Sequence, residues 1–177
     1  MQVFWARGYD SASTRDLLEA MQLSRSSLYQ AFGSKEQLFL EALRCYRENL
    51  IGRLHRQLEA SPSAMVFLEG LFRDTARDAG SDRAAIGCLI FNSASELGQR
   101  GDLPSREASE SVGAITELFH QAVVRAQAEG DIDPQCDARS LATYLTLGMA
   151  GLRTLLKSGA DAGEATRAVE LVLATLR

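Results

Sequence analysis

Residues 13–38 read STRDLLEAMQLSRSSLYQAFGSKEQL, and this stretch decides the fold of the first part of the chain. It predicts two short helices, at 14–21 and 24–31, because each run is bounded by polar turn residues and carries apolar residues at helical spacing. Ser13 or Thr14 suits the N-cap of the first helix, since a short side-chain oxygen accepts an N–H group that the first turn leaves unpaired.

Outward from this stretch, the sequence predicts helix almost everywhere. Apolar residues recur at steps of three or four over 34–59, which indicates one long helix, and Ser34 with Gln37 has capping-box spacing. No segment shows the alternation typical of a strand. We therefore expect an all-α protein of nine helices. Besides the three named, they are a short helix in 1–7 and helices at 63–79, 84–99, 105–129, 137–158 and 162–176.

The composition is that of an ordinary globular protein. Of the 177 residues, 46% are hydrophobic and 24% are charged, which argues against a disordered or collagen-like chain. The net charge is −4, with 8 Lys and Arg against 7 Asp and Glu in the first 59 residues and an acidic remainder. The chain is therefore no polybasic nucleic-acid coat, although a local basic surface remains compatible with this charge.

The cysteines and apolar runs exclude several classes of protein. Three separated cysteines form no CxxC pair and none lies at metal-ligand spacing from either histidine, so we expect neither a disulfide framework nor a metal site. The longest mostly apolar run, 141–152, is shorter than the roughly 18 residues that a membrane span needs. We expect a cytoplasmic protein with no membrane partner.

The two short helices and their turn form a helix-turn-helix candidate. In such a unit the first helix supports the second, and the second presents its outer face to the major groove of DNA. Leu17, Met21, Leu23 and Leu28 are the apolar residues expected to face inward. The second helix offers Arg and Gln, which pair with guanine and adenine edges, and several Ser residues that bond either bases or phosphates.

The same residues carry a family resemblance. Gly8-Tyr9-Asp10-Ser11-Ala12-Ser13-Thr14-Arg15-Asp16-Leu17, and above all Leu28-Tyr29-x-x-Phe32-x-x-Lys35-x-x-Leu38, resemble the DNA-binding head of the tetracycline-repressor (TetR) family. The resemblance implies a two-domain architecture, with a small helix-turn-helix head at 1–45 and a helical effector-binding and dimerisation body at 46–177.

The resemblance also implies which residues contact DNA. Thr14, Tyr29 and Lys35 would bond phosphates, with Lys35 helped by the positive end of the helix that it begins. Phe32 would face the core. Two alternatives stay open: Tyr29 as a buried aromatic, and Arg15 as a solvated surface charge. The full predicted DNA-binding set is Thr14, Arg15, Ser24, Arg25, Ser26, Ser27, Tyr29, Gln30 and Lys35.

Two features depart from the family pattern. Gln22 stands in the turn where the family usually has Gly, and a left-handed conformation there would cost on the order of 1 kcal/mol. The first helix is also shorter than the family's. We therefore expect either a start farther upstream or a shortened head.

The last two expected helices are apolar over a wide arc, so they must be buried on more than one side. The resemblance implies that they form a two-fold four-helix bundle between subunits, in which glycines permit close approach. The alternative is that both helices belong to the core of one subunit. The predicted dimer interface consists of Leu141, Leu145, Gly148, Leu152, Leu155, Val169, Val172 and Leu176.

The resemblance further implies a small-molecule effector, with no cofactor, held by the middle helices. Asn92 and His120 are the most informative candidates, because polar groups on apolar helices need partners. Cys88 is either a sensing thiol or an inert packing residue. The predicted pocket residues are Phe67, Leu71, Cys88, Phe91, Asn92, Phe119, His120 and Tyr144.

The predicted function is a ligand-responsive transcriptional regulator: a repressor that binds a palindromic operator as a homodimer and is released by its effector. Two alternatives remain. One is a helical ligand-binding or adaptor protein without DNA binding, and the other is a small helical enzyme that uses the pocket. We find no HExxH, GxSxG, P-loop or dinucleotide motif, and we assign no catalytic residue.

Overall fold

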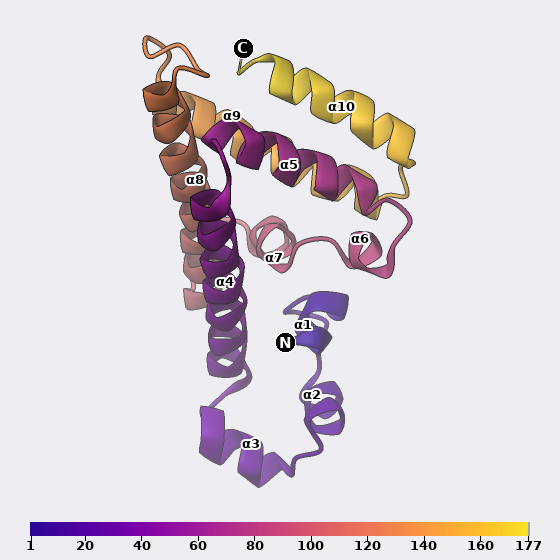
Figure 1. The fold of residues 1–177 in the computed structure, drawn as a ribbon. Helices are drawn as coiled ribbons and strands as arrows, with labels where there is room; N and C mark the ends of the chain where they lie inside the picture. Colours follow the sequence, from indigo (N-terminus) through magenta and orange to yellow (C-terminus); the bar gives the residue numbers. More distant parts are fainter. Residues whose placement is uncertain (177) are drawn as a thin grey trace. The chain divides into compact units, whose positions relative to one another are not determined.

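The computed structural model describes residues 1–176, which contain helices and no strand (Figure 1). The all-α fold class is confirmed. Within that range the helices are α1 (Gln2–Arg7), α2 (Thr14–Met21), α3 (Arg25–Phe32), α4 (Lys35–Ala60), α5 (Ala64–Arg77), α6 (Asp82–Ile86), α7 (Leu89–Leu97), α8 (Leu103–Glu129), α9 (Ala138–Lys157) and α10 (Ala162–Ala174).

The one helix expected over 84–99 is two helices, α6 and α7. Gly87 ends α6 with φ 70° and ψ −152°, and Cys88 follows in an extended conformation before α7 begins. A positive φ is readily adopted by glycine but not by most other residues, so the chain changes direction at this position. The other expected helices are present with ends within a few residues of the prediction.

The described chain divides into two compact units, which we treat separately. Unit 1 contains residues 1–49 and 88–112, and unit 2 contains residues 50–87 and 113–176, so the division falls inside α4 and α8. This division groups residues that contact one another within the folded chain. The functional division into 1–45 and 46–177 stays a prediction.

An aromatic cluster lies in the core of unit 1. The ring of Phe39 lies 5.2 Å from that of Phe4 in an edge-to-face arrangement and 4.7 Å from that of Tyr9. Aromatic pairs in such geometries contribute about 0.5–1.5 kcal/mol beyond their buried area. Leu17 of α2 and Leu28 of α3 are almost fully buried. These contacts hold α1 against the first turns of α4 and close the head around its own core.

Within unit 1, a buried carboxylate joins α4 to the start of α8. The side chain of Glu107 is only 4% exposed, and its Oε2 lies 2.7 Å from Arg44 Nε. Its Oε1 lies 2.7 Å from Arg47 Nη1. A buried charge is costly to leave unpaired, so Glu107 depends on both arginines.

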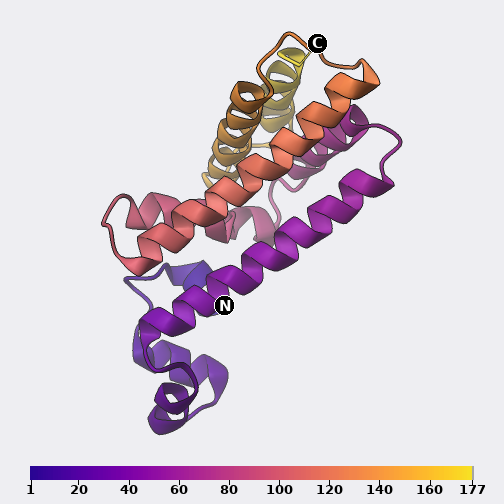
Figure 2. The same cartoon turned by 90° about the vertical axis from the view of Figure 1, so that its left-hand side faces the viewer.

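Unit 2 is built around α5, α9 and α10, which lie side by side in Figures 1 and 2. Leu68, Leu145 and Leu173 supply buried side chains from these three helices. At Gly148 an added Cβ would lie 3.1 Å from Val172 Cγ1, which is tighter than ordinary contact. The lack of a side chain at Gly148 therefore allows α9 and α10 to approach closely within one chain.

The Glu107 cluster predicts an unequal effect of two arginine substitutions on α4. Arg47→Ala leaves Glu107 Oε1 buried without its charged neighbour, and we expect the free energy of unfolding to fall by about 2 kcal/mol. Arg53→Ala removes an exposed arginine of the same helix and should change it by under about 0.5 kcal/mol. Urea unfolding followed by circular dichroism measures both, and equal losses would contradict the role given to Glu107.

Candidate nucleic-acid interface

Short capping side chains fix where α2 and α3 begin. Ser13 Oγ accepts a hydrogen bond from Asp16 N at 3.1 Å, and Asp16 Oδ2 accepts one from Ser13 N at 2.9 Å. This reciprocal pair is a capping box, which confirms Ser13 as the N-cap. Ser24 caps α3 in the simpler way, with its Oγ accepting from Ser27 N at 3.1 Å.

The turn between the two helices is left-handed at Gln22, as the family pattern implied. Gln22 has φ 53° and ψ 38°, and among the described residues it is the one non-glycine with positive φ. Leu23 N donates to Leu18 O at 3.1 Å and Gln22 N donates to Glu19 O at 3.3 Å. These bonds satisfy carbonyl groups at the end of α2, so they offset part of the strain at Gln22.

The apolar face of the helix pair is buried and its polar face is exposed. Leu17 and Leu28 are buried as predicted, and Met21 is half-buried. Leu23 was expected to face inward, but its side chain is 37% exposed, because the turn places it outside the contact between the helices. Phe32, also predicted to lie in the core, is half-buried.

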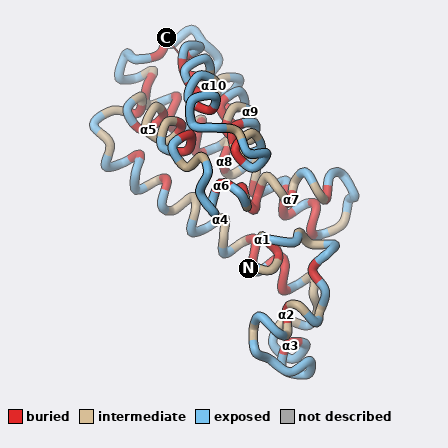
Figure 3. The backbone as a smooth tube through the Cα atoms, turned by 90° about the vertical axis from the view of Figure 1, so that its right-hand side faces the viewer, coloured by how far each residue is buried: buried red, intermediate tan, exposed pale blue. Residues whose placement is uncertain are grey.

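The outer face of α3 carries the residues predicted to contact DNA. In Figure 3 most of α3 has the colour of exposed residues. Tyr29 is 39% exposed, so the alternative of a buried aromatic does not hold. The guanidinium of Arg25 lies 5.8 Å from the centre of the Tyr29 ring. The exposed members of the predicted set are Arg15, Ser24, Arg25, Ser26, Ser27, Tyr29 and Gln30.

The serines of α3 interact with one another. Ser24 Oγ lies 2.9 Å from Ser26 Oγ and 2.8 Å from Ser27 Oγ, in addition to its cap bond. Ser24 is therefore engaged in ending the turn, while Ser26 and Ser27 keep hydroxyl groups on the exposed face. Thr14, the first residue of α2, is half-buried.

Lys35 is the first residue of α4, close to the exposed face. Its Nζ donates to Asp10 O at 3.3 Å and lies 4.8 Å from the centre of the Tyr9 ring. Ser34 Oγ accepts from Gln37 N at 3.0 Å, so the start of α4 is capped where predicted. The charge of the lysine and the positive end of the helix dipole both attract an anion at this position.

Carboxylates near this face are held in their ionised form. Arg100 bonds the side chain of Asp10 and keeps the pKa of that carboxyl below its usual range. The hydroxyl and N–H of Ser13, followed by the charge of Arg7, lower the pKa of Asp16 in the same way. Burial raises the pKa of the Tyr9 phenol. The charges on this face therefore stay fixed at neutral pH.

The predicted effector residues are divided between the two units, and the pocket stays a prediction. Cys88 is buried, and its Sγ accepts a hydrogen bond from Tyr46 Oη at 3.7 Å. The rings of Phe119 and Phe72 lie 6.0 Å apart inside unit 2. Cys88, Phe91 and Asn92 belong to unit 1, whereas Phe67, Leu71, Phe119, His120 and Tyr144 belong to unit 2.

The predicted dimer residues are largely used inside the chain. Leu145, Leu152, Val169 and Leu176 are buried in the core of one subunit, which leaves their side chains little surface for a partner. The residues of the set that are only half-buried are Leu141, Gly148, Leu155 and Val172.

Two exposed leucines were missed by sequence reasoning. Leu147 of α9 is 66% exposed and Leu171 of α10 is 73% exposed. Both helices are apolar on more than one face, so periodicity alone could not tell which face turns inward. Tyr144 and Gly151 lie on the same face of α9 as Leu147, because they are three and four residues away, and both are exposed.

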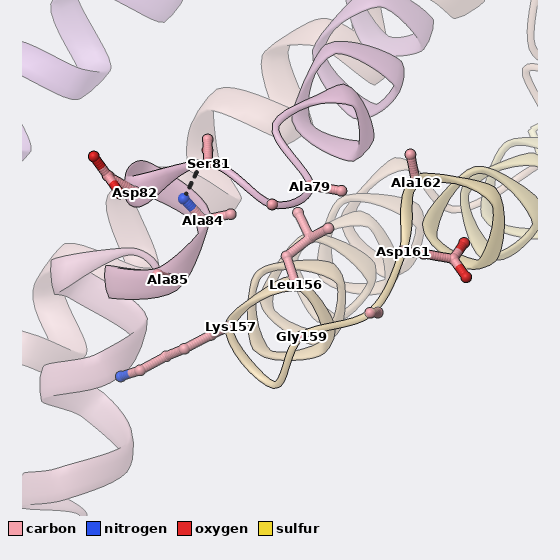
Figure 4. A pocket seen from close by; sticks show the side chains of 12 residues that line it. Ala79, Ser81, Asp82, Ala84, Ala85, Leu156, Lys157, Gly159, Asp161 and Ala162 are labelled. Atoms are coloured by element: carbon pink, nitrogen blue, oxygen red, sulfur yellow. Dashed lines mark hydrogen bonds between the residues drawn. The ribbon is translucent and has the colours of Figure 1, made fainter.

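Unit 2 also contains a cavity of about 480 Å³ between the segment 79–85 and the turn from α9 to α10 (Figure 4). None of the predicted pocket residues lines it. Ser81 Oγ and Asp161 Oδ1 are already used as N-caps, because they accept hydrogen bonds from Ala84 N and Glu164 N in the first turns of α6 and α10. Figure 4 shows Lys157 and Asp161 extending in different directions, so no polar set converges there.

Two kinds of feature are absent from residues 1–176. No group of three or more His, Cys, Asp or Glu side chains is placed to hold a metal ion there. None of the helices within that range has an apolar run that could span a lipid bilayer.

Comparison with known proteins gives the family. A family model described as "Bacterial regulatory proteins, tetR family" matches residues 1–42, and "Tetracyclin repressor-like, C-terminal domain" matches residues 68–172. The chain belongs to the TetR family. The TetR head model thus covers α1–α3 and the first turns of α4, which carry the predicted DNA-contacting residues.

Curated relatives described as HTH-type regulators match over most of their length. The chain is 30% identical to the transcriptional repressor ComR of Escherichia coli, over 91% of this chain and 77% of ComR. It is 28% identical to the regulator YezE of Bacillus subtilis, over 99% of this chain and 91% of YezE. These relatives are transcriptional regulators, so the chain's function is that of a regulator and not of an enzyme.

Solved structures agree with the family assignment. A cysteine-substituted form of the TetR-family regulator CifR, complexed with a 26-base-pair operator duplex, is 34% identical, with a TM-score of 0.86 over 99% of this chain and 92% of that chain. Reduced NemR of E. coli has a TM-score of 0.86 at 17% identity, over 97% of this chain and 89% of that chain. At that identity, NemR shows the fold alone.

Proposed function

We propose that this TetR-family regulator acts in the cytoplasm as a homodimeric repressor that binds palindromic double-stranded DNA, and that a small molecule releases it. The exposed polar face of α3 is the observation that carries the proposal. Its side chains surround a buried Leu28, so α3 has one side for the core and the other for a partner. The operator-bound CifR relative supports DNA as that partner.

Roles within the face follow from side-chain chemistry. Arg25 and Gln30 are exposed on α3 and have the donor and acceptor sets that pair with guanine and adenine. Lys35 and Tyr29 are suited to phosphate oxygens, which fix the register of the protein on the duplex. Thr14, Arg15, Ser26 and Ser27 complete the contact surface.

A second subunit supplies a second copy of α3, which is the recognition helix of the proposed repressor. Two-fold related recognition helices about 34 Å apart read the two halves of a palindromic site. The exposed Leu147 and Leu171 are apolar side chains that a partner would cover. We propose that the dimer contact includes this surface of α9 and α10, together with the half-buried Leu155 and Val172.

The effector acts by preferring one conformation of the repressor. A ligand releases DNA only if its affinity for the form that fits the operator is lower than its affinity for another form. The predicted pocket residues Asn92 and His120 remain the polar groups to test once an effector is known.

DNA binding is tested with a labelled duplex from the promoter region beside the protein's own gene. Arg25→Ala should lower the affinity about tenfold or more and weaken discrimination between this duplex and random DNA. Lys35→Ala should weaken binding to both duplexes. It should also reduce the salt slope, which is the slope of log affinity against log salt concentration, by about one per subunit. Fluorescence anisotropy at several salt concentrations measures these effects.

Arg77→Ala is the control, because Arg77 is exposed on α5 and pairs with Asp74. It should leave the affinity for the duplex unchanged. An absence of salt-dependent binding by the unsubstituted protein would reject the repressor and favour the helical ligand-binding or adaptor protein.

The dimer is tested by placing a charge on the exposed apolar surface. Leu147→Glu and Leu171→Glu should shift the protein from dimer to monomer, because each buries an unpaired carboxylate in the proposed contact. Val66→Glu on α5, where Val66 is 53% exposed, is the matched control and should remain a dimer. Sedimentation velocity gives the masses, and a dimer that survives both leucine substitutions would place the contact elsewhere.

A further inference from the structure

The loop between α1 and α2 is held by a carboxylate from α7. Glu96 Oε2 accepts a hydrogen bond from Tyr9 N at 2.9 Å, and Glu96 Oε1 accepts one from Asp10 N at 2.8 Å. Both oxygens of one side chain thus bind two successive backbone N–H groups of the head. Hydrogen bonds to an ionised acceptor are stronger than neutral ones, so this is a firm attachment.

Gly8 makes room for this attachment. Gly8 has φ 79°, and an added Cβ would lie 2.6 Å from Glu96 Oε2 and 2.8 Å from Glu96 Oε1. Any side chain at this position would strain the backbone and would also displace the carboxylate. The loop is therefore built for close approach to Glu96.

Arg100 holds the same loop by its side chain. Arg100 Nη1 and Nη2 donate to Asp10 Oδ1 at 3.0 Å and Oδ2 at 2.6 Å, a bidentate pair, and Nη2 also donates to Glu96 O at 3.0 Å. The low pKa of Asp10 follows from this pair. We call Glu96, in the last turn of α7, and Arg100, in the connection between α7 and α8, the α7 clamp.

The clamped loop in turn supports Lys35. Asp10 O accepts from Lys35 Nζ, and the ring of Tyr9 lies under the same ammonium group. The two residues whose N–H groups bind Glu96 are therefore the two that hold Lys35. The same loop leads directly into Ser13, the N-cap of α2.

We propose that Glu96 and Arg100 are positioning residues for DNA binding, which hold the loop 8–10 so that Lys35 meets a phosphate. This proposal rests on the proposed DNA-binding function. The clamp joins the C-terminal end of α7 to the head, and α7 also carries Phe91 and Asn92 of the predicted effector set. A displacement of α7 would reach Lys35 through the clamp without passing along α4.

Glu96→Gln tests the proposal because a positioning role and a plain surface charge predict opposite changes in the affinity for DNA. Glutamine replaces one of the two carboxylate oxygens with an NH2 group, a donor that would face a backbone N–H, so the two-oxygen contact with Tyr9 N and Asp10 N is lost. We expect the affinity for the promoter duplex to fall about tenfold. If Glu96 were only a surface charge, its neutralisation would strengthen binding to the phosphates. Glu110→Gln makes the same charge change at an exposed position of α8 in unit 1 and is the matched control, with unchanged or slightly stronger binding.

A double-mutant cycle shows whether the clamp acts through Lys35. Glu96→Gln should reduce the salt slope by about one per subunit, as Lys35→Ala does. Added to Lys35→Ala, it should cause little further loss, because the phosphate contact is already absent. A merely structural role would lower the melting temperature and leave the slope unchanged, with independent losses of affinity.

Arg100→Gln and Arg106→Gln form a second pair, which keeps the test valid if Glu96→Gln fails to fold. Both arginines are exposed in unit 1, and of the two it is Arg100 whose side chain bonds the loop, through Asp10. Arg100→Gln should weaken DNA binding more, and hydrogen exchange at the Tyr9 and Asp10 amides should become faster in Glu96→Gln.

The outcomes separate the two proposals. Absence of DNA binding by the unsubstituted protein overturns the proposed function. Normal binding by that protein, with equal or tighter binding by Glu96→Gln and equal effects of the two arginine substitutions, overturns the positioning role alone.

Discussion

The proposed DNA-facing surface depends on the burial of a few apolar side chains beneath two short helices. Isolated helices as short as α2 and α3, with 8 residues each, are unstable in water, since the first turn costs more than its hydrogen bond returns. Leu17 and Leu28 anchor these helices, and Phe4 and Phe39 complete the core of the head. Because this core fixes the rotation of α3, Arg25 and Gln30 are exposed while Leu28 is covered. Loss of the packing would remove the surface even if every polar residue remained.

Local signals made the head predictable from sequence. Ser13 and Ser24 cap their helices by contacts that span three residues, and Gln22 adopts the left-handed conformation that the turn requires. The prediction was wrong where packing decides between similar residues, as at the exposed Leu23. It also joined α6 and α7, because a single Gly87 inside an apolar run is a weak signal until its φ is known.

Contacts between residues that are distant in the sequence could not be predicted from it. Glu96 and Tyr9 are 87 residues apart, and nothing in the sequence pattern pairs Glu96 with the loop 8–10. The pairing of Glu107 with Arg44 and Arg47 is hidden for the same reason. On α9, the apolar pattern continues around the helix, so Leu145 in the core and Leu147 on the surface look alike in sequence. Such choices depend on which surfaces meet, and only the folded chain shows them.

Hydrogen exchange of the protein with and without its promoter duplex tests the central claim most directly. The claim is that α3 and the start of α4 form the DNA-binding surface and that α9 and α10 do not. The duplex should slow exchange in peptides covering 13–37, with the largest change in α3, and leave peptides of α10 unchanged. Unchanged exchange in α3 at saturating duplex, or protection confined to α9 and α10, would contradict the account.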